Sequence, residues 1–430
     1  MNRPLGLTIL IFGLIFLGLG TLNSGFLIIA IPLMAYLGMG MLNFPTLPNL
    51  EFHRDISSER TGKNMPFQVD LHITNMGEQL ENVIIRDVLP QYLKIVRGET
   101  SILLNLPPKS TAELSYTVRG DRGYYRFREI RVKTGDALGL YTREKTFISP
   151  GHIFILPETW KLKNFFIQPR QTLIYSGVIP SRQAGSGVEF YGVRSYQTGD
   201  PLRRINWKAS ARHLETYYSN EFQQERVADV RLILDARRRS DVQSSEGSLF
   251  EHSISATAAL AQYLLINGNR VGLLIYGKYL DLTHPGYGKI QYERILRALA
   301  RAQVGDSPIF ERLDYLPDRF LPIQAQIILV TPLLKEDTAS LLKLRARGHQ
   351  VMVISPNPIL SESKGLSPDN ALELGSRLAS LERRLVESKL HRAGISYLNW
   401  PVDKHLDQVL QLTVNRLRSY IRSRTDLGAE

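Results

Sequence analysis

The chain has 430 residues, of which 43% are hydrophobic and 22% are charged, and this composition excludes a largely disordered protein. The length predicts two or three domains, and the net charge of +12 favours an acidic partner such as nucleic acid, anionic lipid or an acidic protein. Because the chain has no cysteine, disulfides, thiolate nucleophiles and cysteine-ligated zinc are excluded.

Two apolar runs near the N-terminus predict a membrane-embedded pair of helices. Residues 5–22 and 26–42 contain no charged side chain, and the turn residues Asn-Ser-Gly at 23–25 separate them. Each run is close to the minimum that crosses about 30 Å of hydrocarbon, and in lipid the backbone must pair within a helix. We therefore expect a transmembrane helical hairpin over residues 1–43. A cleaved signal peptide, a buried soluble hairpin and a single span are the alternatives.

Basic residues outside the two runs predict the orientation of the hairpin. Arg3 precedes the first run, and Arg54, Arg60 and Lys63 follow the second, whereas the turn between the runs has no charge. Positive charges favour the cytoplasmic side of a membrane. We therefore expect a protein of the cell membrane with two spans, with both chain ends and all soluble domains in the cytoplasm.

Short runs with a period of two follow the hairpin and predict β-strands. The clearest is Phe-Gln-Val-Asp-Leu-His-Ile-Thr at residues 67–74, and similar runs lie at 83–88, 112–118 and 129–134. Turn signals rich in Gly and Pro separate these runs. Several short strands at this spacing predict an antiparallel β-sandwich over residues 44–156.

Residues 157–226 form a predicted connector, and an α/β domain is expected after it. Within the connector, the stretch from Gly185 to Arg226 is too dense in Gly, Arg, Asp and aromatic residues for an ordinary helix or strand. From residue 227 onward, buried-type apolar runs alternate with helical patterns. This alternation predicts a doubly wound parallel sheet over residues 227–430.

Asp235 ends the first strand of that sheet, at the edge where ligands bind in open α/β folds. Its position is similar to the start of the Asp-x-Ser-x-Ser loop that holds Mg²⁺ in von Willebrand factor A domains. Here residues 237–239 are all arginine, and Thr-Pro-Leu at 331–333 stands where that fold has Thr-Asp-Gly. A dication beside three guanidinium groups is electrostatically unfavourable. We expect no cofactor, with Mg²⁺ at Asp235 as the alternative; Asp235 would otherwise cap the strand or pair with a local arginine.

The segment around residues 194–212 combines basic, acidic and aromatic side chains at short range. One interpretation is recognition of an anion or a partner protein, with Trp207 as an anchor. The candidate residues are Arg194, Tyr196, Asp200, Arg203, Arg204, Trp207, Lys208 and Arg212. The other interpretation is a buried brace, in which Asp200 pairs with an arginine and Trp207 packs between the two domains. Nucleic acid is not expected, because acidic residues interrupt the basic ones.

Motifs of common enzyme classes are missing from the sequence. It has no Gly-x-x-x-x-Gly-Lys-Ser/Thr phosphate loop, no His-Glu-x-x-His and no Gly-x-Ser-x-Gly elbow, and its nine histidines show no ligand spacing. We therefore expect a protein without catalytic activity. The alternative is an enzyme of another kind, namely an envelope-associated hydrolase that uses Asp200 and Asp235 as acid and base. That hypothesis requires two neighbouring carboxylates, one with a raised pKa.

The string that runs from Arg194-x-Tyr-x-x-Gly-Asp to Trp-Lys-x-Ser-Ala-Arg212 carries a resemblance to a known family. Together with the paired apolar runs and the Asp136-Ala-Leu-Gly-Leu-Tyr motif, it resembles the bacterial domain-of-unknown-function family number 58, which usually has Pro where this chain has Ala137. Members of that family are similar to von Willebrand factor A proteins and commonly accompany MoxR-type AAA+ ATPases. The resemblance implies a membrane-tethered adaptor that works with such an ATPase on client proteins, and it implies no catalytic activity. A purely structural assembly factor that has no ATPase is the remaining alternative.

Overall fold

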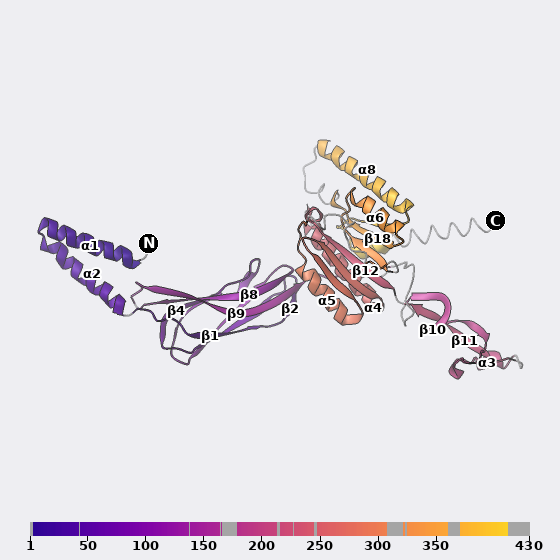
Figure 1. Ribbon diagram of the computed structural model, residues 1–430, viewed down its shortest axis with the longest axis horizontal. Helices are drawn as coiled ribbons and strands as arrows, with labels where there is room; N and C mark the ends of the chain where they lie inside the picture. The colour runs from indigo at the N-terminus through magenta and orange to yellow at the C-terminus, as the bar shows by residue number, and fades with distance from the viewer. Residues whose placement is uncertain are drawn as a thin grey trace. The chain divides into compact units, whose positions relative to one another are not determined.

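The computed structural model describes residues 3–42, 44–136, 138–163, 165, 179–212, 216–226, 228–244, 247–307, 321–322, 325–359 and 370–411. Ala137 and residues 412–421 of the predicted last helix lie outside this part of the chain. The contacts divide the protein into two compact units, Met1–Leu156 and Pro157–Glu430 (Figure 1). Each unit has its own hydrophobic core.

The first unit begins with two apolar helices, α1 (Arg3–Thr21) and α2 (Ser24–Leu42). Each has 19 residues, which corresponds to about 28 Å at 1.5 Å per residue. Asn23 closes the turn between them, because its side-chain oxygen accepts a hydrogen bond from the Gly25 amide at 2.9 Å. Both helices are long and apolar enough to cross a membrane, as the sequence predicted.

Two β-sheets follow in the first unit and share one core. Their strand orders are β1-β3-β7-β5 and β2-β9-β8-β4-β6, and all pairs are antiparallel except β2 with β9. The strands are β1 (Leu50–Ile56), β2 (Arg60–Gly62), β3 (Phe67–Asn75), β4 (Leu80–Asp87), β5 (Lys94–Arg97), β6 (Ser101–Leu106), β7 (Thr111–Arg119), β8 (Gly123–Gly135) and β9 (Thr142–Leu156). In β3 every second side chain is buried, as its alternating sequence predicted.

A buried ion pair joins the two sheets of the first unit. Arg54 on β1 contacts Asp87 on β4 at 2.6 Å, and both side chains are fully buried. Tyr116 on β7 donates a hydrogen bond to the same carboxylate at 2.6 Å, and burial together with Asp87 raises the pKa of this tyrosine. The Arg54 side chain also donates to the Ser149 carbonyl on β9. Arg54 is thus a core residue of this unit as well as one of the basic flanks of the hairpin.

The second unit contains a six-stranded sheet with the order β16-β15-β12-β17-β18-β19. Five strands are parallel, and β16 at one edge is antiparallel to β15. The strands are β12 (Asp229–Ala236), β15 (Arg270–Gly277), β16 (Leu280–Gly286), β17 (Gln326–Val330), β18 (Gln350–Pro356) and β19 (Ser396–Trp400). The antiparallel edge strand β16 is a correction, because the sequence was expected to give a wholly parallel sheet; its Pro285 suits an edge position.

Helices cover both faces of this sheet. They are α4 (Leu249–Ile266), α5 (Gly288–Arg301), α6 (Asp337–Ala346) and α8 (Asn370–Arg392). In Figure 1, α4 and α5 lie on one side of the sheet and α6 and α8 on the other. Ser248 caps α4 by accepting hydrogen bonds from the amides of Phe250 and Glu251. Short elements complete the unit: 3₁₀ turns Leu202–Arg204 and Arg238–Ser240, and the two-residue strands β13 (Gln243–Ser244) and β14 (Gly247–Ser248).

The second unit also carries a two-stranded ribbon, which corrects the expectation for the connector. β10 (Ile179–Ser195) pairs antiparallel with β11 (Tyr218–Arg226), and the one-turn helix α3 (Trp207–Ser210) lies between them. Much of the 185–226 stretch is therefore ordinary paired strand. Its register shifts three times between Ser181 and Gly192, because the glycine-rich sequence forms bulges rather than a regular ladder. These irregularities are what hid the ribbon in the sequence.

Candidate functional site

The ends of two neighbouring parallel strands bring together a group of polar residues that we call the strand-end cluster: Asp235, Arg237, Thr331 and Asp337. Asp235 is the last but one residue of β12, Thr331 directly follows β17, and Asp337 is the first residue of α6. Because β12 and β17 are adjacent and parallel, their carboxyl ends meet at the same edge of the sheet. All four residues are almost completely buried.

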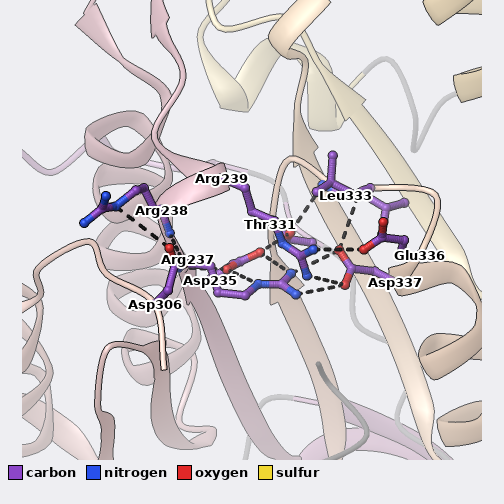
Figure 2. Close-up of polar contacts among 10 residues, drawn as sticks. Asp235, Arg237, Arg238, Arg239, Asp306, Thr331, Leu333, Glu336 and Asp337 are labelled. Carbon is purple, nitrogen blue, oxygen red and sulfur yellow. Dashed lines mark hydrogen bonds and ion pairs between the residues drawn. The ribbon is translucent and has the colours of Figure 1, made fainter. Parts of the chain in front are cut away.

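Arg237 holds both carboxylates of the strand-end cluster (Figure 2). Its Nη2 and Nε atoms donate to Asp235 at 2.6 Å and 2.9 Å, and Nη1 and Nη2 donate to Asp337 at 3.0 Å each. Thr331 donates its hydroxyl to Asp235 Oδ2 at 2.7 Å. The guanidinium also lies over the ring of Tyr276, 5.0 Å from its centroid. Planar, bidentate contacts of this kind are the strong form of an arginine–carboxylate pair.

In the strand-end cluster, burial and the charge of the ion-pair partner shift the pKa of a side chain in opposite directions. Burial disfavours the charge of Arg237, but the hydrogen bonds and charges of its partners outweigh this effect and raise its pKa above the ordinary arginine value. Burial raises the pKa of Asp337, and Arg237 only partly offsets the rise because Asp235 places a second negative charge beside it. One buried guanidinium thus forms ion pairs with two carboxylates.

The strand-end cluster does not fit a divalent metal ion. A metal at Asp235 would need carboxylate and hydroxyl oxygens that point to a shared open position. Here the oxygens of Asp235 and Asp337 already accept hydrogen bonds from Arg237, whose positive charge lies where the ion would have to sit. In the described part of the chain, no group of three or more His, Asp or Glu side chains is arranged to hold a metal. Asp235 instead pairs with a local arginine, one of the two alternatives that the sequence left.

Two further arginines, Arg238 and Arg239, follow Arg237 in the loop after β12. The exposed Arg238 donates its backbone amide to Asp306 at 2.9 Å. Arg239 contacts Glu336 at 3.1 Å and Asp337 at 3.3 Å, so it joins the loop after β12 to the start of α6. All three arginines of the 237–239 run therefore have acidic partners, which explains how the protein tolerates three adjacent positive charges.

A second group of polar residues lies on the turn between β10 and β11. We call it the ribbon tip and define it by the eight residues predicted above as a recognition site: Arg194, Tyr196, Asp200, Arg203, Arg204, Trp207, Lys208 and Arg212. The structure places all eight on one continuous segment, from the end of β10 to two residues past α3. They divide into residues that build the turn and residues that face solvent.

Arg194, Tyr196 and Asp200 build the frame of the ribbon tip. Arg194 contacts Asp200 at 2.7 Å and Glu221 on β11 at 2.8 Å, so it links the turn to both strands. Asp200 also accepts a hydrogen bond from the Gln197 amide at 3.0 Å, and Tyr196 donates its hydroxyl to the Asp200 carbonyl. The hydrogen bond from Arg194 lowers the pKa of Asp200 and raises that of Arg194 itself. The expected pairing of Asp200 with an arginine is thus present.

Arg203, Trp207, Lys208 and Arg212 face solvent, whereas Arg204 is half-buried and its positive charge helps to lower the pKa of Asp200. Trp207 is 66% exposed. Its ring contacts only the edge of Tyr217 among the aromatic pairs of the described residues, with 6.4 Å between centroids. Three further exposed apolar side chains of the ribbon were not singled out in the sequence analysis: Phe190, Leu202 and Tyr217. Their exposure depends on the ribbon, which a pattern of single residues could not reveal.

The hydrolase hypothesis required Asp200 and Asp235 to form one acid–base pair. Asp200 is held by Arg194 in the ribbon, and Asp235 is held by Arg237 in the sheet. The pKa of Asp200 is lowered, whereas a general acid needs a raised one. This particular pair of residues therefore lacks the arrangement that the hypothesis needs.

Comparison with known proteins finds one family whose model covers both the strand-end cluster and the ribbon tip. A family model described as "Protein of unknown function DUF58" matches residues 192–358, which include the whole ribbon tip and the whole strand-end cluster. The chain is also 30% identical over 277 residues to the uncharacterized protein YeaD of Bacillus subtilis (strain 168), over 63% of this chain and 67% of that protein. The chain belongs to the DUF58 family. The resemblance noted in the sequence is thus confirmed at the level of the family.

Solved structures add little to the DUF58 assignment. A CARDB domain from Pyrococcus furiosus is 16% identical and covers 25% of this chain and 95% of that chain, with a TM-score of 0.18. A FixG-related protein from Vibrio parahaemolyticus is 12% identical and covers 26% of this chain and 98% of that chain, with a TM-score of 0.17. Similarities this weak support no inference about the DUF58 chain.

Proposed function

We propose that this DUF58 protein is a membrane-anchored, cytoplasm-facing adaptor whose ribbon tip docks another protein. The observation that carries the proposal is the group of exposed aromatic and cationic side chains around Trp207, held on a frame of ion pairs and hydrogen bonds. Trp, Tyr and Arg dominate the binding energy of protein interfaces, and a preorganised frame reduces the entropy lost on binding. A soluble protein rarely exposes such a group without a partner.

The partner that we propose is a MoxR-type AAA+ ATPase, with which the adaptor would help client proteins to assemble or mature. Family resemblance supports this choice, and the charge of the chain supports an acidic contact surface on the partner. The described part of the ribbon tip exposes Arg203, Lys208 and Arg212 without an ion pair inside the chain, so these cations are available to acidic groups. A purely structural assembly factor would use the same surface without an ATPase.

We also propose that the α/β sheet is a von Willebrand factor A-like domain that works without a metal. The order of its parallel strands and the position of Asp235 at a strand end support the likeness. The guanidinium of Arg237 supplies the positive charge at that edge. Docking by this adaptor should therefore not depend on Mg²⁺.

A photocrosslinking experiment tests the proposed docking surface. Trp207 would be replaced by a photoreactive phenylalanine in the full chain, in its native membrane, and adducts would be identified by mass spectrometry. The matched control carries the same replacement at Tyr279, an exposed aromatic residue that also neighbours a lysine, Lys278. We expect an adduct with the ATPase from position 207 and not from position 279. Equal adducts from both positions, or none with the ATPase, would contradict the proposal.

The proposed orientation rests on the exposed basic residues Arg3, Arg60 and Lys63 on one side of the helix pair. Because the natural chain has no cysteine, Tyr279→Cys gives a single reactive thiol outside the hairpin. In intact cells a membrane-impermeant maleimide should not label it, and after permeabilisation it should. Labelling of intact cells would place the soluble units outside and remove the ATPase as a partner.

A further inference from the structure

Helix α8 presents a row of leucines to solvent on the face that points away from the sheet. Leu374, Leu378, Leu381 and Leu385 are 54–64% exposed. Their spacing of four, three and four residues places them on one side of the helix, because each residue advances by about 100°. We call this row the α8 leucine stripe. It extends for about 17 Å along the helix at 1.5 Å per residue.

The opposite face of α8 packs against the domain. Leu390 is fully buried in the core beneath it. Arg383 donates to the Pro332 carbonyl at 2.9 Å and to the Ser355 hydroxyl at 2.7 Å. The leucine stripe is therefore a second apolar face on a helix whose first apolar face is already used.

Basic side chains border the leucine stripe. Arg377 and Arg384 lie on one flank and Lys389 on the other, and Arg392 continues the line of the stripe; all four are exposed. Glu382 lies on the same flank as Lys389 and contacts Lys335 at 3.9 Å, and Arg377 contacts Glu373, one turn before it, at 2.7 Å. The stripe thus combines the heptad spacing of a coiled-coil seam with flanks that are mainly positive.

We propose that the α8 leucine stripe binds an amphipathic helix of another protein that carries leucine-like residues on one face and acidic residues beside them. Charge complementarity favours this occupant. In paired helices, flanking residues of opposite charge determine which partner binds, and the basic flanks of the stripe favour Glu and Asp at the flanking positions of the partner helix. This surface lies on a different element from the ribbon tip, so the proposal does not depend on the docking function proposed above.

A second copy of this chain is a poorer occupant. In a parallel pair of α8 helices Arg377 would face Glu382 of the other copy, but Arg384 would face Lys389. In an antiparallel pair Glu382 would face Lys389, but Arg377 would face Arg384, so neither orientation pairs all its flanking charges favourably. Each copy also carries a net charge of +12, so self-association would bring like charges together in either orientation. A lipid surface is poorer too, because the stripe has no Trp or Phe and has Glu382 beside it, whereas helices that lie in a membrane interface carry aromatic residues and a basic polar face.

Binding of two synthetic peptides to the full chain in nanodiscs tests the proposal. Both peptides have about three heptads with Leu at the core positions, and they carry either Glu or Lys at the flanking positions. We expect the Glu peptide to bind with a Kd on the order of 1–10 µM, because the stripe is short, and the Lys peptide to bind at least about tenfold more weakly. No binding of the Glu peptide, or equal binding of both, would overturn the proposal.

Substitutions show whether the peptide occupies the stripe. Leu378→Ser with Leu381→Ser should weaken the Glu peptide at least about tenfold without lowering the thermal midpoint, because both side chains are already exposed. Ile290→Ser on α5, which removes an equally exposed apolar residue, is the matched control and should leave binding unchanged. Arg384→Glu with Lys389→Glu should shift the preference towards the Lys peptide. Unchanged affinity in the leucine variant, or an unchanged preference in the charge variant, would count against this surface.

Two readouts detect the other occupants. Sedimentation that shows dimers of the wild type but monomers of the double leucine variant would assign the stripe to a second copy. A fluorophore on Leu381→Cys, the only thiol in that variant, reports the local environment. A blue shift caused by anionic lipid in the absence of peptide would assign the stripe to the membrane. Either result would replace the helix proposal; a monomer with no lipid response is expected.

Discussion

The strand-end cluster and the ribbon tip use the same residue types in opposite environments. Each contains an arginine that holds two carboxylates: Arg237 holds Asp235 and Asp337, and Arg194 holds Asp200 and Glu221. Arg237 is almost completely buried, whereas the side chain of Arg194 is about one-third exposed. The difference teaches that a charged motif has to be interpreted through its burial, because the same pairing is buried in the core in one place and lies near the surface, where we propose a docking site, in the other.

The physical reason lies in the cost of desolvation. A buried ion pair that loses one partner leaves an uncompensated charge in the protein interior, whereas a pair near the surface can be replaced by water. Substitutions in the strand-end cluster should therefore act on stability. Substitutions in the ribbon tip should act on local order and binding.

The largest effect is expected for Arg237→Met. It leaves Asp235 and Asp337 buried together without their shared cation, and we expect a loss of about 3–5 kcal/mol in the free energy of unfolding. Chemical denaturation of the full chain in detergent measures it. Arg238→Met, which removes a neighbouring exposed guanidinium, is the control and should change stability by less than about 0.5 kcal/mol. Similar losses in both variants would show that burial does not distinguish them.

A smaller, pH-dependent effect is expected for Asp337→Asn. Because burial raises the pKa of Asp337 in the folded protein, the folded state holds a proton there at a pH at which the unfolded chain has lost it. The contribution of Asp337 to the free energy of unfolding is therefore least favourable above the raised pKa and grows as the pH falls through it. The stability of the wild type relative to Asp337→Asn should increase as the pH falls from 7 towards the ordinary carboxyl pKa of about 4. Denaturation curves at several pH values measure this difference in the free energy of unfolding. A difference that does not change with pH, or that changes in the opposite direction, would contradict a raised pKa of Asp337.

A local effect is expected for Arg194→Ala in the ribbon tip. Without this side chain, the turn at Asp200 and the strand at Glu221 lose their common partner. Hydrogen exchange of the amides around residues 196–200 should accelerate, while the thermal midpoint of the chain stays within error of the wild type. Lys278→Ala in the loop between β15 and β16 is the control. A large drop in the midpoint would place Arg194 among the residues that stabilise the whole unit.

The smallest effect is expected from metal ions. Since Arg237 already neutralises charge at the strand ends, neither millimolar Mg²⁺ nor a chelator should shift the thermal midpoint of the wild type. A concentration-dependent rise in the midpoint with Mg²⁺ would reveal an ion that binds the folded state. It would also contradict the proposal that docking is independent of metal.

Local sequence patterns predicted the regular elements well. The alternation in β3 and the apolar run that ends at Asp235 in β12 each place their element within a few residues of its observed bounds. The apolar pair α1 and α2 was predicted from composition alone. These features depend on neighbours in the chain, which is why the sequence discloses them.

Long-range pairings were not predictable in the same way. Arg237 and Asp337 are 100 residues apart, and Arg54 and Asp87 are on different sheets of the first unit. In the sequence, Arg237 looked like an obstacle to a metal ion; in the fold it occupies the position between the two acids. The ribbon was missed because bulges break its alternation, and so its exposed apolar side chains were missed with it.

The most direct test of the central claim is the affinity of the full chain in nanodiscs for the purified MoxR-type ATPase, measured for Trp207→Ala with Lys208→Ala. The matched control is Tyr279→Ala with Lys278→Ala, an exposed aromatic–lysine pair on a different loop. We expect the ribbon-tip variant to bind at least about tenfold more weakly, a loss of about 1.4 kcal/mol or more, with an unchanged thermal midpoint, and the control to bind like the wild type. Wild-type affinity in the folded ribbon-tip variant would contradict the account.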